Sequence, residues 1–90
     1  MAPQRRKSDR LIEFRGVLLR QWRHEAGYVP ADLLAEALRR YPECDGTTKF
    51  LISNWERLKT RPDLPVMLAL VELSGKPFRD WFTWPGKDQT

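Results

Sequence analysis

The fold is decided by residues 47–84, which read TTKFLISNWERLKTRPDLPVMLALVELSGKPFRDWFTW. At the start of this stretch, apolar residues recur at the spacing of one helical face: Leu51, Ile52, Trp55 and Leu58. Thr47 or Thr48 can cap the first turn, and the polar segment KTRPD ends the helix. We therefore predict an amphipathic helix over residues 48–58, with its apolar side in the core and a polar side facing outward.

Two further helices are predicted in the same stretch. Asp63 can cap the first of them, and Pro65 is tolerated in its first turn. The following segment VMLALVEL is apolar almost all round, which predicts a central, well-covered helix that ends at Ser74–Gly75. A short fifth helix is then predicted to contain three aromatic residues, Phe78, Trp81 and Phe82.

Upstream of this stretch the pattern predicts two more helices. The first is expected from about Arg10 to Ala26, and its apolar face is formed by Leu11, Phe14, Leu18 and Trp22, widened by Val17 and Leu19. Gly16 within it either permits a close helix crossing or marks a weak point. The second helix begins near Pro30, and its apolar side is formed by Leu33, Leu34, Ala37 and Leu38. Pro42 ends it, and YPECDGTT (residues 41–48) forms a long irregular connection.

Composition limits the class of protein. Ninety residues make one small domain, and no apolar run approaches the roughly 20 residues that cross a bilayer, so we expect no membrane association. No secretory signal is evident at the start, and the lone Cys44 fits a reducing, cytoplasmic setting. Cys44 lies in a polar loop, where exposure of the thiol is plausible. The net charge is +4, and residues 1–40 hold nine Lys and Arg against five Asp and Glu, which suits a side that faces a polyanion or merely a solubilising surface.

These elements predict an all-α fold, a compact bundle of five helices with no strands and an extended loop between helices two and three. We expect residues 1–8 to be a flexible basic tail, 9–85 a single domain, and 86–90 a flexible C-terminal tail. Three tryptophans are expected in the core: Trp22, Trp55 and Trp81. The motifs of an enzyme are not found, since the chain has no glycine-rich phosphate loop and no nucleophile motif paired with a His. With one His and one Cys, a zinc site is not expected, nor any other metal, cofactor or small-molecule substrate.

The order and spacing of these fragments resemble a known family. The third helix of the XRE/Cro-like, phage-repressor type of helix-turn-helix domain typically reads I-S-x-x-E-x-G-x-x-x-P, and Ile52, Ser53, Glu56 and Pro62 stand in register with it. LRQWRHEAG, LLAEAL and LALVELSGKPFRDWF are similar to other helices of that family, so that the resemblance covers roughly residues 17–82. Three departures are the longer connection before helix three, Val29–Pro30 in place of the family's polar residue that opens helix two, and Leu58 in place of the family's Gly.

The resemblance implies a sequence-specific regulator of transcription that binds double-stranded DNA as a homodimer, with helix 48–58 in the major groove. By position, the residues implied in base contacts are Thr48, Lys49, Phe50, Ser53 and Asn54. An Asn pairs with adenine, a Lys donates to guanine, and Phe50 can pack on a thymine methyl group or, equally well, against the long connection. The residues implied in phosphate contacts are Arg20, Arg23, Arg57, Lys59, Thr60 and Arg61. Glu56 is expected to be structural, paired with a nearby Arg.

An alternative remains open on the sequence alone. A helix-turn-helix fold can also serve as a protein–protein interaction module. The surfaces for that role would be the 41–48 loop and the C-terminal aromatic residues, namely Phe78, Trp81, Phe82 and Trp84.

Overall fold

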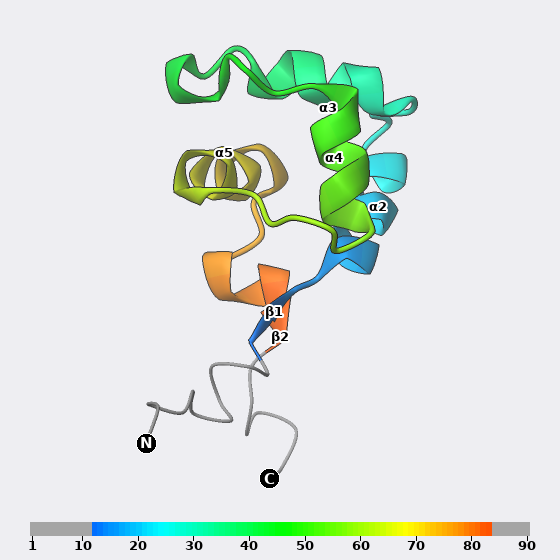
Figure 1. Ribbon diagram of the computed structural model, residues 1–90, viewed down its shortest axis with the longest axis vertical. Helices are drawn as coiled ribbons and strands as arrows, with labels where there is room; N and C mark the ends of the chain where they lie inside the picture. The colour runs from blue at the N-terminus through cyan, green and yellow to red at the C-terminus, as the bar shows by residue number, and fades with distance from the viewer. Residues whose placement is uncertain (1–11, 84–90) are drawn as a thin grey trace, which may run out of the picture.

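A computed structural model describes residues 12–83 (Figure 1). The elements run in the order β1 (Glu13–Phe14), α2 (Gly16–Glu25), α3 (Ala31–Leu38), η1 (Pro42–Cys44, a 3₁₀ turn), α4 (Lys49–Glu56), α5 (Leu64–Ser74), η2 (Phe78–Trp81, a 3₁₀ turn) and β2 (Phe82–Thr83). In Figure 1, α3 crosses the top of the molecule, α4 runs down the front beside α2, α5 is seen end-on, and the two strands lie at the base. None of the helices in residues 12–83 has the length and apolar character that a bilayer crossing requires.

The described chain is mostly helical, but the prediction of five helices without strands is wrong. It has four α-helices and a two-stranded sheet in which Glu13 pairs with Thr83 and Phe14 with Phe82. The first helix therefore begins at Gly16, because the backbone before it is engaged in strand pairing. The predicted fifth helix is the single turn η2, which leads directly into β2. The predicted tails, and the predicted helix residues Arg10 and Leu11, lie outside the described residues.

Aromatic packing explains why the strands form. Phe14 is buried and stacks on Trp81, with ring centroids 6.2 Å apart, and meets Phe82 edge-on at 5.9 Å. Trp81 in turn meets Trp22 of α2 edge-on at 5.8 Å. The backbone N–H of Arg15 donates to the carbonyl of Trp81 at 2.8 Å, so the two ends of the described chain are joined by hydrogen bonds as well as by rings.

The core contains the three tryptophans that the sequence placed there, Trp22, Trp55 and Trp81, which confirms that prediction. Other residues predicted in the core are partly or largely exposed: Val17, Leu33, Leu51 and Leu58. Val17 points outward because the apolar face predicted across residues 11–22 is interrupted where the strand meets the helix. Helix α5 is also less covered than predicted, since Leu64 and Leu68, one turn apart, are both more than half exposed.

The connection between α3 and α4 is a well-packed loop. Cys44 and Thr47 are buried within it, so the expectation of an exposed thiol is wrong. Backbone bonds from Cys44 to Tyr41 and from Thr47 to Cys44 close two turns, and Nη1 of Arg39 donates to the Thr47 carbonyl at 2.9 Å. The turn η1 packs against α5, which fixes the position from which α4 begins.

Candidate nucleic-acid interface

Helix α4 is the element whose outward face was predicted to bind DNA. The Thr48 hydroxyl accepts a hydrogen bond from the backbone N–H of Leu51 at 3.3 Å, which confirms the predicted cap. Ile52 and Trp55 are buried against the core. On the outer side, Thr48, Lys49 and Phe50 are exposed, while Ser53 and Asn54 are half-buried. The five residues implied in base contacts therefore share one short helix and its cap, with the most exposed three at the N-terminal end.

Lys49 and Phe50 form the tip of this surface. Phe50 is 69% exposed, and the Nζ of Lys49 lies 5.4 Å from the centre of its ring. This geometry is that of a cation–π contact. The same Nζ lies 4.0 Å from a carboxylate oxygen of Asp32 at the start of α3, in a pair that is exposed on both sides. Because such pairs contribute little stability in water, Lys49 remains available to an external acceptor.

A buried ion pair joins α4 to α2. The Nε of Arg23 donates to Glu56 at 2.7 Å and its Nη2 donates to the other carboxylate oxygen at 3.3 Å. The Nη1 of Arg23 donates to the carbonyl of Tyr28 at 3.0 Å. The two side chains are only 9% and 11% exposed, and removing one partner of such a pair costs about 3–5 kcal/mol. The expected structural role of Glu56, paired with an Arg, is confirmed. Arg23 is buried in this pair and is therefore unsuited to the phosphate contact predicted for it.

Close backbone packing accompanies this ion pair. A Cβ atom built on Gly16 would lie 2.5 Å from the carbonyl oxygen of Glu56 and 2.7 Å from that of Trp55. The first turn of α2 thus touches the last turn of α4, and only a residue without a side chain fits between them. Of the two explanations that the sequence left open for Gly16, the close helix crossing is confirmed.

A polar cleft of about 370 Å³ opens between α2 and α4 on the outer side of this contact. Its lining residues are Val17, Arg20, Arg23, Ser53, Glu56 and Arg57. Arg20 on α2 and Arg57 after α4 are both exposed, so two long cationic side chains line this cleft together with Ser53. Sequence reasoning included Arg20 and Arg57 in a list of cations but did not predict that they share a cleft, because their proximity depends on how α2 crosses α4.

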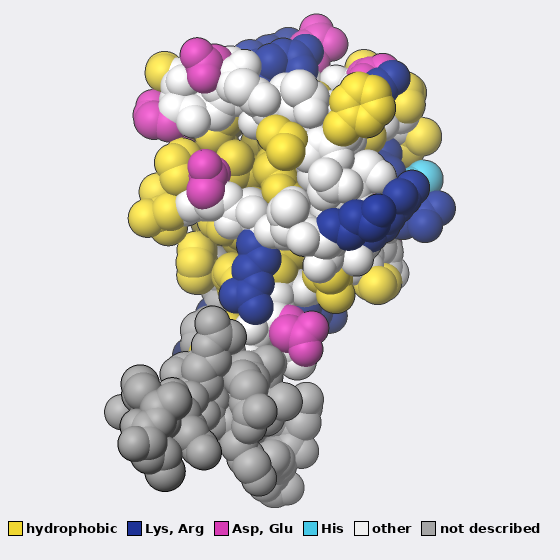
Figure 2. Space-filling model, in the orientation of Figure 1, with side chains coloured by type: hydrophobic (Ala, Val, Ile, Leu, Met, Phe, Trp, Pro, Cys, Tyr) yellow, Lys and Arg dark blue, Asp and Glu magenta, His cyan; other side chains and the backbone are white. Residues whose placement is uncertain are grey.

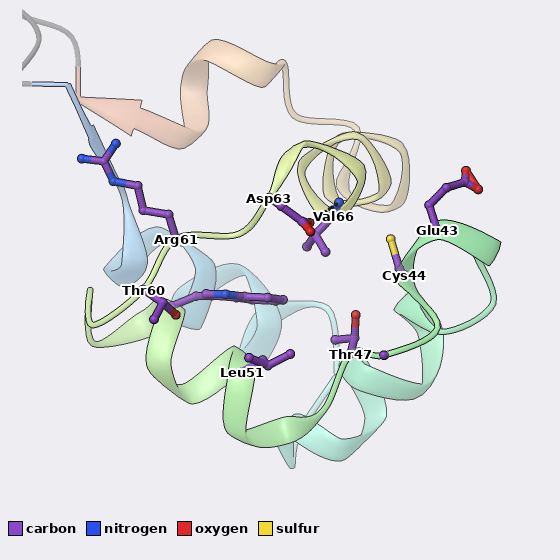
Figure 3. Close-up of a pocket in the computed structure, with 10 residues that line it drawn as sticks. Glu43, Cys44, Thr47, Leu51, Thr60, Arg61, Asp63 and Val66 are labelled. Carbon is purple, nitrogen blue, oxygen red and sulfur yellow. Dashed lines mark hydrogen bonds between the residues drawn. The ribbon is translucent and has the colours of Figure 1, made fainter.

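The turn after α4 carries the remaining predicted phosphate contacts. Arg57, Lys59, Thr60 and Arg61 are all exposed. Arg61, however, donates from Nη2 to the Ile12 carbonyl at 3.3 Å, and in Figure 3 its side chain points away from α4, toward β1. In Figure 2, one cluster of dark blue Lys and Arg side chains lies to the right of the lower end of α4, and a second dark blue group lies closer to the strands. Magenta acidic side chains lie toward η1 and α5, and others lie at the top right and near the strands.

A second cavity, of about 320 Å³, lies between η1, α4 and the start of α5 (Figure 3). Cys44 and Thr47 line one side, with Leu51 and Trp55 on α4 and Asp63 and Val66 on α5. Burial raises the pKa of the Cys44 thiol, and the nearby carboxylates of Asp63, Glu43 and Asp45 raise it further. The thiol is therefore protonated near neutral pH and is a poor nucleophile. No group of His, Cys, Asp and Glu within residues 12–83 is arranged to hold a metal ion.

Two of the C-terminal aromatic side chains predicted to contact a protein partner are packed inside the fold. Trp81 and Phe82 pack into the aromatic cluster, Phe78 is 39% exposed, and Trp84 lies outside the described residues. A groove of about 290 Å³ lies instead between η1 and α5, lined by Tyr41, Glu43, Cys44, Leu64, Pro65, Leu68, Ala69 and Glu72. Burial and the Glu72 carboxylate, in that order, raise the pKa of the Tyr41 hydroxyl. This groove is lined by apolar side chains together with the acidic Glu43 and Glu72, unlike the cationic cleft beside α4.

Comparisons of the chain with models of known protein families, with curated proteins and with solved structures return no significant match. The assignment of function therefore depends on the geometry of α4 and its surroundings.

Proposed function

We propose that the protein is a sequence-specific, double-stranded DNA-binding regulator of transcription of the phage-repressor helix-turn-helix type, in which α4 enters the major groove. The observation that carries this proposal is the exposed N-terminal end of α4, with Thr48, Lys49 and Phe50 presented outward, on the same helix whose C-terminal end borders the cationic cleft of Arg20 and Arg57. In helix-turn-helix proteins the N-terminal residues of the second helix contact base edges while flanking cations bind phosphate.

The way α4 is held supports this role. A recognition helix must be rigid, because base contacts require donors and acceptors within a few tenths of an ångström. Helix α4 is fixed to α2 by the Arg23–Glu56 pair and the Gly16 contact, and to the core by Ile52 and Trp55. Its outer face makes none of these attachments, so the helix can contact a ligand without disturbing the fold.

The phosphate contacts proposed for this surface lie near the C-terminal end of α4. Arg20 on α2 shares a cleft with Arg57, and Lys59 follows in the turn after α4, so the three cations can contact the sugar–phosphate backbone that borders a major groove. Thr60 is exposed and can add a neutral contact. Arg23 is omitted because it is buried, and Arg61 is a weaker candidate because it is bonded to Ile12.

We also propose that binding occurs as a homodimer, as the resemblance implies. Two-fold symmetric proteins bind half-sites about one helical turn apart. The exposed Leu64 and Leu68 provide an apolar surface on α5 that lies apart from α4 and could be shared between two copies.

Selection of bound sequences from random duplexes tests the proposal. We expect a defined motif with two half-sites, and we expect the double variant Lys49→Ala/Asn54→Ala to lose at least about tenfold in affinity for it, since each base contact contributes about 1–3 kcal/mol. Lys76→Ala, which removes a charge between α5 and η2, is the matched control and should bind normally. Recovery of no motif, or equal binding by the double variant with its fold intact, would refute the proposal.

A second candidate function is a protein-interaction module. The observation that favours it is the groove between η1 and α5, where Leu64 and Leu68 are exposed beside the acidic Glu43 and Glu72. This role predicts that selection recovers no motif, so the same experiment separates the two candidates.

A further inference from the structure

The first turn of α4 presents two chemically different side chains as a single unit. Phe50 is 69% exposed, whereas most aromatic rings of the described chain are buried or packed in the cluster around Trp81. A phenyl ring exposed to this extent does not stabilise the core. The Lys49 ammonium lies 5.4 Å from the centre of this ring, where the ring's negative face attracts it, and 4.0 Å from an Asp32 carboxylate oxygen. The cation and the apolar ring are therefore presented together.

Neighbouring base pairs can offer the complement of such a unit. In the major groove the thymine C5-methyl group is the apolar feature, and guanine N7 and O6 are a pair of acceptors. Successive base pairs are stacked about 3.4 Å apart, so a methyl group and the acceptors of the next guanine on the same strand are separated by a few ångströms. A cation 5.4 Å from a ring centre is separated from the ring by a similar span.

We propose that Lys49 and Phe50 together read a 5-methylpyrimidine followed by guanine. Phe50 packs on the 5-methyl group, and Lys49 donates to N7 and O6 of the guanine that follows. This inference rests on the function proposed above and specifies the ligand of the same site. Thymine and 5-methylcytosine carry the same methyl group at the same position, so both a thymine–guanine step and a methylated cytosine–guanine step satisfy it. An unmethylated cytosine–guanine step lacks the methyl group and is bound more weakly.

The test uses the full-length protein and the duplex recovered by selection. Thymines are replaced one at a time by deoxyuridine, which removes only the methyl group. We expect one thymine, 5′ to a guanine, at which affinity falls about fourfold, the value that corresponds to burial of one methyl group. Replacing that thymine–adenine pair by cytosine–guanine should weaken binding to a similar extent, and 5-methylcytosine at the same place should restore what the missing methyl group contributed.

The variants assign the effect to the two side chains. With Phe50→Ala, the thymine and deoxyuridine duplexes should bind equally, while Lys49→Gln should keep the response to the methyl group and lose the preference for the guanine. Thermal melting of each variant checks that the fold is retained.

Two outcomes separate this inference from the function on which it depends. If the protein binds its selected duplex but every replacement of a thymine by deoxyuridine leaves the affinity unchanged, the inference is overturned and DNA binding stands. It is equally overturned if Phe50→Ala retains the full discrimination between thymine and deoxyuridine. If no duplex is selected at all, the proposed function fails and the inference fails with it.

Discussion

Gly16 and Arg23 determine how α4 is presented, although neither lies on its outer face. Gly16 lets the first turn of α2 touch the carbonyl groups at the end of α4, and Arg23 reaches from the last turn of α2 to the Glu56 carboxylate. The two contacts lie at the same end of α4, where they fix its direction relative to α2. The burial of Arg23 also explains why a count of cations on α2 overestimates those that can reach a phosphate.

Replacing Gly16 by Ala tests the backbone contact. The added methyl group would overlap the Glu56 carbonyl oxygen at 2.5 Å, and a rigid backbone cannot yield without moving α4. We expect destabilisation by about 2 kcal/mol, a fall in Tm of about 8–16 °C. Gly46→Ala is the matched control, because a Cβ there meets nothing within 4 Å. Equal melting temperatures for the two variants would contradict the close crossing of α2 and α4.

At the scale of the element, the C-terminal end of α4 is closed in an unusual way. The N–H of Leu58 donates to the Trp55 carbonyl and that of Lys59 to the Asn54 carbonyl, which is the hydrogen-bond pattern of a Schellman motif. That motif requires a residue with positive φ, normally Gly, and Leu58 occupies the position with φ +62°. Leu58 therefore ends the helix in place of a Gly, at the cost of left-handed backbone for a leucine.

Leu58→Gly should stabilise the protein. Relief of the left-handed conformation is worth about 1–2 kcal/mol, and the added freedom of the unfolded chain offsets part of it, which leaves a gain of about 0.5 kcal/mol. Chemical denaturation measures this difference. Leu58→Ala keeps the strain and loses part of the side chain's contacts, so it should be less stable than the wild-type protein. If Leu58→Gly is no more stable than Leu58→Ala, the strain assigned to Leu58 is absent.

Elements that depend on local signals were predicted well from the sequence, and those that depend on distant partners were not. Thr48 and Asp63 cap α4 and α5 as predicted, because a cap needs only the next three residues. The strands β1 and β2 were missed because each is two residues long and forms only by pairing with the other end of the described chain. The burial of Cys44 was missed for a similar reason, since it depends on how η1 packs against α5.

On the scale of the whole molecule, charge and apolar surface are divided between two sides. Exposed cations lie beside the C-terminal end of α4 (Figure 2), and Glu43 and Glu72 line the groove that contains Leu64 and Leu68. The sequence indicated a basic N-terminal half, but the relevant division is spatial, because Arg20 and Arg57 meet across a cleft while Arg23 is buried. This division suits the proposal that one side binds a polyanion and that another is shared between two copies.

The most direct test of the proposed function is the salt dependence of binding to the selected duplex. Three exposed cations are assigned to phosphates, Arg20, Arg57 and Lys59, and each releases about 0.9 counterion, so a plot of log K against log salt should have a slope of about −3. Arg57→Gln should reduce the slope by about 1, and Lys76→Gln, which changes the net charge equally, should leave it unchanged. An affinity that is independent of salt, or a slope that Arg57→Gln does not alter, would contradict the account of α4 as a DNA-binding helix.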